Sequence, residues 1–189
     1  MYILSKRNAV ILAIALSILM WLTRDHHVAT LTHLPDASWA IFFLLGFYFR
    51  QRMMLPVFLA QAALADYLAI TQFGVDDYCV TAAYPFLIPA YFSLWLAGRW
   101  YAARHQFHAR SLPRFAAAAV SGTAACEMIS SGSFYFLGGR FANTSLTEFA
   151  SRLAQYFPGN LAGVALYLGI ASLIHMLIVS AQHSASPAQ

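Results

Sequence analysis

The residue with the most distinctive chemical surroundings is Cys79, in the stretch from Gly74 to Pro85 that separates two apolar segments. Its neighbours Asp76 and Asp77 disfavour a negatively charged sulfur, so Cys79 is a poor nucleophile on its own. Coordination to a metal reverses this, because the metal displaces the thiol proton. One soft ligand cannot hold a bare ion, but it can supply the axial ligand of a metal already held by a macrocycle, such as a haem or a corrin. The alternative is an inert cysteine.

Two acidic residues, Asp66 and Glu127, fall inside long apolar segments. A charge at the centre of a membrane costs at least about 2.5 kcal/mol, so such residues usually face a cavity or a partner. On a helix, Asp66 shares its face with small residues and Glu127 with polar ones, namely Ala62, Ala63 and Ala69 for the first and Thr123, Ser130 and Ser131 for the second. We expect both acids to line an outward-opening pocket. The alternative is that each makes a hydrogen bond between helices.

Other side chains could complete such a pocket. Tyr78 and Tyr84 flank the cysteine with flat amphipathic rings that suit a large planar ligand. His27, in the preceding outer loop, could reach over the mouth. The second cysteine, Cys126, lies inside an apolar segment and is interpreted as structural, with a disulfide to Cys79 as the alternative.

The elements that position these residues are predicted from composition. The chain is 60% hydrophobic and only 10% charged, against roughly 25% charged in a soluble domain. About 20 apolar residues in a helix cross the hydrocarbon core, and long unbroken runs favour helices over barrel strands. The sequence predicts one all-α transmembrane domain over residues 1–189, with six spans near 8–22, 37–49, 53–73, 81–101, 115–137 and 160–180.

Charge placement predicts the orientation. Alternate loops carry eight cations and no acid: Lys6, Arg7, Arg50, Arg52, Arg99, Arg104, Arg110 and Arg114. The other loops hold Arg24, Arg140 and Arg152 together with Asp25, Asp36, Asp76, Asp77 and Glu148. By the positive-inside rule both termini are cytoplasmic. The formal charge of +4 suits anionic membrane lipid as a partner rather than nucleic acid.

Two local patterns add detail. Ala9 and Ala13 form a small-xxx-small face on the first span, which favours docking of a partner helix, although an alanine-rich chain also produces this spacing by chance. Ser145 and Glu148 have capping-box spacing, which predicts the start of a short amphipathic helix on the outer surface.

These features together resemble a known group of proteins. Six short spans, cytoplasmic termini, the Ala-xxx-Ala of Ala9 and Ala13, and an outward ligand loop are similar to the substrate-binding S-components of ECF vitamin transporters. The Asp-Asp-Tyr-Cys79 loop, with Asp66 before it and Tyr84 after it, resembles the BtuM family of bacterial cobalamin importers.

The resemblance implies uptake of cobalamin (vitamin B12) across the bacterial cytoplasmic, or inner, membrane by a multi-pass protein. It implies that Cys79 is the axial ligand of cobalt, that cobalamin is held base-off, and that Cys79 can assist in removing cyanide from cyanocobalamin. Asp66, Tyr84 and His27 would line the pocket. The chain has no nucleotide-binding motif, so an ECF energising module would be contacted through Ala9 and Ala13.

Two other functions stay open from the sequence. The chain could be an S-component for another vitamin, with Cys79 incidental. It could also be an intramembrane cysteine hydrolase that uses Cys79, a histidine and Asp66, because a hydrolase needs a base beside its thiol.

Overall fold

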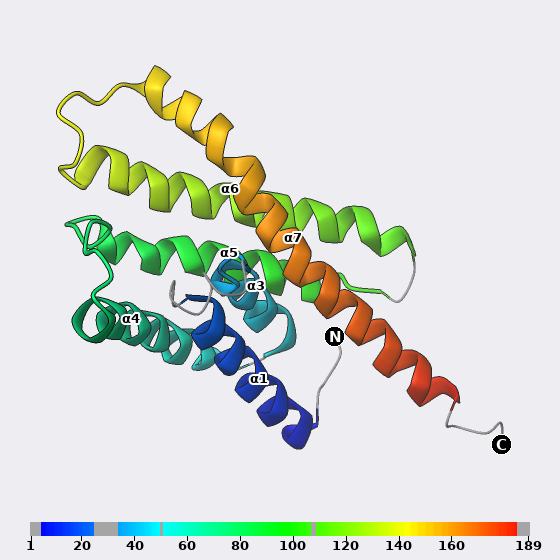
Figure 1. Ribbon diagram of the computed structural model, residues 1–189. Helices are drawn as coiled ribbons and strands as arrows, with labels where there is room; N and C mark the ends of the chain where they lie inside the picture. Colours follow the sequence, from blue (N-terminus) through cyan, green and yellow to red (C-terminus); the bar gives the residue numbers. More distant parts are fainter. Residues whose placement is uncertain (1–4, 25–33, 50, 107–108, 185–189) are drawn as a thin grey trace.

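The computed structural model describes residues 5–24, 34–49, 51–106 and 109–184. Within these ranges all regular structure is helical (Figure 1). The elements are α1 (Lys6–Arg24), α3 (Ser38–Tyr48), α4 (Met54–Phe73), η1 (Tyr84–Phe86), α5 (Leu87–Ala102), η2 (Ala109–Ser111), α6 (Leu112–Leu137) and α7 (Leu146–Ser184).

Three described helices are long and apolar enough to cross a membrane: Lys6–Arg24, Met54–Phe73 and Leu146–Ser180. This indicates a membrane protein. The other predicted spans also form helices, but α3 has 11 residues and α5 has 16, and about 20 are needed for the hydrocarbon core. The six-span topology therefore stays a prediction.

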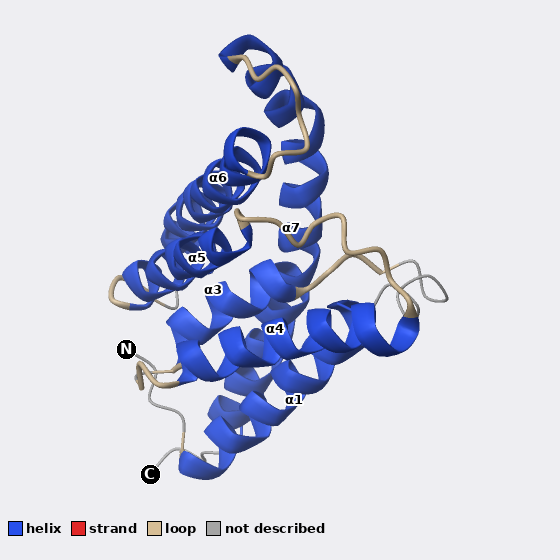
Figure 2. Ribbon diagram, turned by 90° about the vertical axis from the view of Figure 1, so that its left-hand side faces the viewer, coloured by secondary structure: helices blue, strands red, loops and turns tan. Residues whose placement is uncertain are grey.

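The centre of the bundle is α3, and Figure 2 shows the other helices around it. Its residues from Ala40 to Leu45 are buried on every side, as expected of a helix that is apolar all round. Two glycines let α3 and α5 meet backbone to backbone. A Cβ atom on Gly46 would lie 2.0 Å from the carbonyl oxygen of Trp95, and one on Gly98 would lie 2.0 Å from that of Phe43.

Several predicted bounds need correction. The first helix continues to Arg24, which the charge pattern had placed in an outer loop. The predicted span from residue 81 begins as a helix only at Leu87, after turns and η1. Pro85 accounts for the later start, because a proline has no N–H to donate and is favoured in the first turn of a helix rather than further inside it.

The largest correction concerns α7. The sequence predicted a short surface helix and a separate span at 160–180, but the structure has one helix from Leu146 to Ser184 with Pro158 inside it. The predicted start is confirmed, since the backbone N–H of Glu148 donates to Ser145 Oγ at 3.2 Å. In Figure 1, α7 crosses over α6.

Candidate ligand-binding site

A cavity of about 480 Å³ opens at the end of the bundle where α4 ends and α5 begins. Its walls come from both of these helices, from the loop between them, and from α6 and α7. The volume lies in the ordinary range for small-molecule sites. The predicted residues Asp66, Cys79, Tyr84 and Glu127 all line it, so the fold brings together residues from three predicted spans and the loop between two of them.

The loop that carries Cys79 has a defined geometry. Gly74 ends α4 in a left-handed conformation with φ of 68°, which a residue without Cβ adopts at no cost. The carboxylate of Asp76 accepts the backbone N–H of Tyr78 at 2.6 Å, and the carbonyl of Asp77 accepts that of Val80 at 2.8 Å. Cys79 is exposed, is not in a disulfide, and lines the cavity.

Arg24 was not predicted as a residue of this site, yet it lines the cavity. Its guanidinium binds Asp66 through two hydrogen bonds, from Nε to Oδ1 at 2.7 Å and from Nη2 to Oδ2 at 2.8 Å. Nη1 donates to Ser38 Oγ and to Tyr91 Oη, both at 2.9 Å. Only 8% of the Arg24 side chain is exposed. A forked, charge-assisted pair of this kind fixes geometry as well as charge.

Asp66 therefore has two roles in the structure. It lines the cavity, and it joins α1 to α4 through Arg24, so the pocket interpretation and the hydrogen-bond interpretation both hold. Tyr84 adds a third contact, because its hydroxyl donates to Asp66 Oδ2 at 2.7 Å. Asp36 supplies a second, looser negative charge, with Oδ2 at 3.7 Å from Arg24 Nη1. The side of the cavity nearest α1 is thus a pre-formed polar network.

Glu127 forms the second polar site on the cavity wall. It is 3% exposed and accepts hydrogen bonds from Ser131 Oγ at 2.7 Å and from Asn160 Nδ2 at 2.6 Å. Ser131 was expected from the helical spacing. Asn160 was not, although a polar residue two positions after Pro158 in an apolar segment was a usable signal. The bond from Asn160 ties α7 to α6 beside the cavity.

The wall formed by α6 and α7 is aromatic, which the sequence analysis did not anticipate. The rings of Tyr135 and Phe149 are stacked with centroids 5.8 Å apart. The Arg152 guanidinium lies over Phe141 at 4.6 Å and pairs with Glu148 at 2.7 Å. All of these residues except Glu148 line the cavity. Flat apolar faces with a few polar groups between them favour a ligand that is itself partly flat.

Tyr78 contacts α6 and the loop that follows it. Its ring contacts Phe134 at 5.7 Å, and the Arg140 guanidinium lies over it at 4.8 Å. Arg140 Nε also donates to the Tyr78 carbonyl at 3.2 Å. Tyr78 does not belong to the cavity lining. It attaches the Cys79 loop to α6, and contact with ligand stays a prediction.

The remaining predicted residues have separate outcomes. His27 lies outside the described residues. Ala9 and Ala13 are half-buried against the core, beside an exposed apolar face that includes Val10 and Ile14, so partner contact through these alanines stays a prediction. Cys126 is fully buried and is not in a disulfide, which agrees with a structural role and leaves no Cys79–Cys126 bond.

No known protein family and no curated protein matches this chain. The functional argument therefore rests on the site itself. Within the described residues, no group of three or more histidine, cysteine or acidic side chains could hold a metal ion. No described histidine lines the cavity, and a thiol hydrolase would need another base there.

Proposed function

We propose that the protein binds cobalamin in this cavity and mediates its uptake across the bacterial cytoplasmic membrane. The observation that carries the proposal is the position of Cys79, an exposed free thiol on the wall of a preformed cavity. A lone thiol suits a metal that arrives already held in a macrocycle, because the corrin supplies the equatorial donors and only an axial position is needed.

The cavity walls offer both kinds of contact that such a cargo needs. A corrin is a flat ring edged with amide side chains. Tyr135, Phe141 and Phe149 supply aromatic surface for the ring. Asp66 and Glu127 already accept hydrogen bonds within the protein, but a carboxylate has about four lone-pair sites, so each can still accept from an amide N–H.

Ligand exchange at cobalt accounts for the proposed assistance in removing cyanide. The S–H bond of Cys79 breaks and a cobalt–sulfur bond forms. Cyanide leaves with the thiol proton as hydrogen cyanide, and the oxidation state of cobalt does not change. Coordination to cobalt removes the thiol proton, so the thiolate forms in the same step as the cobalt–sulfur bond.

The visible spectrum of bound cobalamin tests the cobalt–sulfur bond. Purified protein mixed with cyanocobalamin or aquocobalamin should shift the corrin absorption bands. Cys79→Ala should abolish the shift, whereas Cys126→Ala, at a buried position away from the cavity lining, should keep it. A wild-type spectrum equal to that of free cobalamin, or a shift that survives Cys79→Ala, would remove Cys79 as the ligand.

Uptake is tested separately in cells that depend on imported B12 and lack their own importer. Expression of this protein should restore growth at low cobalamin. Good expression without rescue would favour an S-component for another vitamin, in which Cys79 is incidental.

A further inference from the structure

A second hollow lies outside the candidate site, between the first half of α4 and the last half of α5. It has a volume of about 510 Å³ and shares no lining residue with the ligand cavity. Two arginines, two tryptophans and three other apolar residues line it, namely Arg52, Leu55, Phe92, Trp95, Leu96, Arg99 and Trp100. We call it the α4–α5 groove.

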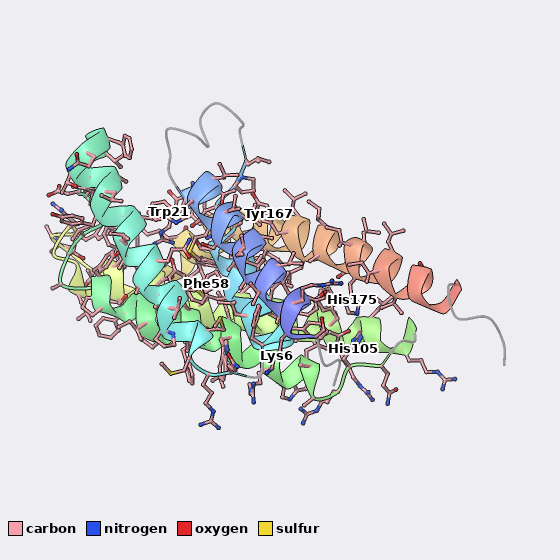
Figure 3. The ribbon with its side chains drawn as sticks, turned by 90° about the horizontal axis from the view of Figure 1, so that it is seen from below. Lys6, Trp21, Phe58, His105, Tyr167 and His175 are labelled. Atoms are coloured by element: carbon pink, nitrogen blue, oxygen red, sulfur yellow. The ribbon has the colours of Figure 1, made fainter. Side chains whose placement is uncertain are left out.

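One end of the groove is basic. Arg52 is exposed and precedes α4, and Arg99 lies in the last turn of α5. The Arg99 guanidinium is held over the Trp95 ring at 5.3 Å, and Nη1 donates to the Phe49 carbonyl at 3.4 Å. No acidic residue belongs to the groove lining. The start of α1, marked by Lys6, and His105 beyond the end of α5 lie toward the same side of the molecule (Figure 3).

The other end of the groove is apolar and exposed. Phe92 is 40% exposed and Leu96 is 46% exposed. Both face the groove together with Leu55 of α4. Phe92 lies seven residues before Arg99, about 10 Å along the helix. The groove therefore changes from basic to apolar along its length, as the head and tail of a phospholipid do.

Trp95 is the buried residue of the groove lining. It lines the groove and is only 5% exposed, and its buried indole Nε1–H has no acceptor among the described residues. A buried donor without a partner costs about 1–3 kcal/mol in general, and buried polar groups nearly always have one. The ring of Trp95 stacks on Phe92, with centroids 5.6 Å apart, and lies beneath the Arg99 guanidinium.

We propose that the α4–α5 groove binds an anionic phospholipid, with its phosphate at Arg52 and Arg99 and an acyl chain along Phe92 and Leu96. Basic pockets between membrane helices on the cytoplasmic side are typical sites for anionic headgroups, and tryptophan belongs at the same depth. Free phosphate would use the arginines but not the apolar end. An acidic protein segment would account for the basic end of the groove but not for an apolar end long enough for an acyl chain.

Native mass spectrometry of the full-length protein tests the proposal. The protein is released from mixed micelles that contain phosphatidylglycerol and phosphatidylcholine with identical acyl chains. The wild-type protein should retain phosphatidylglycerol in clear preference to phosphatidylcholine. Arg52→Gln should lower that preference about fivefold, in proportion to the loss of one arginine near a headgroup, and Arg52→Lys should restore part of it.

Matched variants keep the test decisive. Arg114→Gln removes an exposed arginine of α6 that does not line the groove, and it should leave the preference unchanged. Trp95→Phe replaces the indole with a smaller ring beneath the Arg99 guanidinium, so it should weaken retention of both lipids. Arg99→Gln, if it folds, should lower the preference for phosphatidylglycerol as much as Arg52→Gln does. If it does not fold, the test rests on Arg52→Gln, because Arg52 is exposed.

Three results would overturn the proposal. The first is no preference for phosphatidylglycerol in wild type. The second is an equal loss in Arg114→Gln, which would show a diffuse surface charge effect. The third is displacement of the lipid by excess inorganic phosphate, which would show a simple anion site. The result does not depend on whether the protein binds cobalamin.

Discussion

Asp66 accepts hydrogen bonds from two residues that come from opposite sides of it in sequence, Arg24 and Tyr84. The carboxylate is three-quarters buried, and the guanidinium is almost fully buried. Each group therefore needs the other, because a buried charge without its partner is strongly destabilising. The polar side of the cavity is stable only while this pair is intact.

Asp66→Asn should lower the free energy of unfolding by about 3 kcal/mol. This is the lower end of the general cost of breaking a buried pair, because Asp36 lies 3.7 Å from Arg24 and offsets part of the lost charge. Thermal unfolding in detergent measures the change. Asp77→Asn, at an exposed position in the same end of the molecule, should have little effect.

The double variant Arg24→Met, Asp66→Leu separates stability from binding. It should be more stable than Asp66→Asn, since neither charge is left alone, and yet it should bind cobalamin poorly. Asp66→Asn with wild-type stability would show that the pair contributes nothing.

At the scale of elements, the stability of the bundle depends on the close contact between α3 and α5. Gly98 faces the Phe43 backbone, and Gly46 faces that of Trp95, at distances where no side chain fits. Backbone cannot move aside as the tip of a long side chain can. The close packing of α3 against α5 therefore requires glycine, with no side chain, at one position of each helix.

Gly98→Ala should separate α3 from α5 and destabilise the protein by at least about 2 kcal/mol, within the usual cost of overpacking a core. The readouts are the yield of monodisperse protein and its melting temperature in detergent. Gly169→Ala in α7 is the matched control, because a Cβ there meets nothing within 4 Å and alanine favours a helix over glycine. Equal melting temperatures for the two variants would contradict the close contact.

At the scale of the whole molecule, the cavity and the charge pattern make one joint prediction. The cavity opens at the end of the bundle opposite to the one with most of the basic residues, so Cys79 should face the outside of the cytoplasmic membrane. Cys126 is fully buried and should react with nothing in water.

Labelling of spheroplasts with a membrane-impermeant maleimide measures this sidedness. Wild type should take up one label, Cys126→Ala should take up the same amount, and Cys79→Ala should take up none. Labelling that appears only after the membrane is permeabilised would place Cys79 on the cytoplasmic side and end the proposal of an outward site.

Hydropathy and turn residues were sufficient to predict the local features. The predicted span 53–73 corresponds to α4 at Met54–Phe73, ended by Gly74 as expected, and the apolar composition determined the membrane character. The identity of four cavity residues, Cys79, Asp66, Tyr84 and Glu127, was also predicted, because each stands out within or beside an apolar run. Such features follow from hydropathy and turn chemistry, which act over a few neighbouring residues.

The contacts between helices could not be predicted from local patterns and are seen in the folded bundle. Arg24 meets Asp66 across 42 positions of chain, and Asn160 meets Glu127 across 33. The glycine contact of α3 with α5 and the aromatic wall of α6 and α7 are of the same kind. Each depends on how one helix is rotated and crossed against another. That arrangement is set by the packing of the whole bundle, which hydropathy along a single chain does not encode.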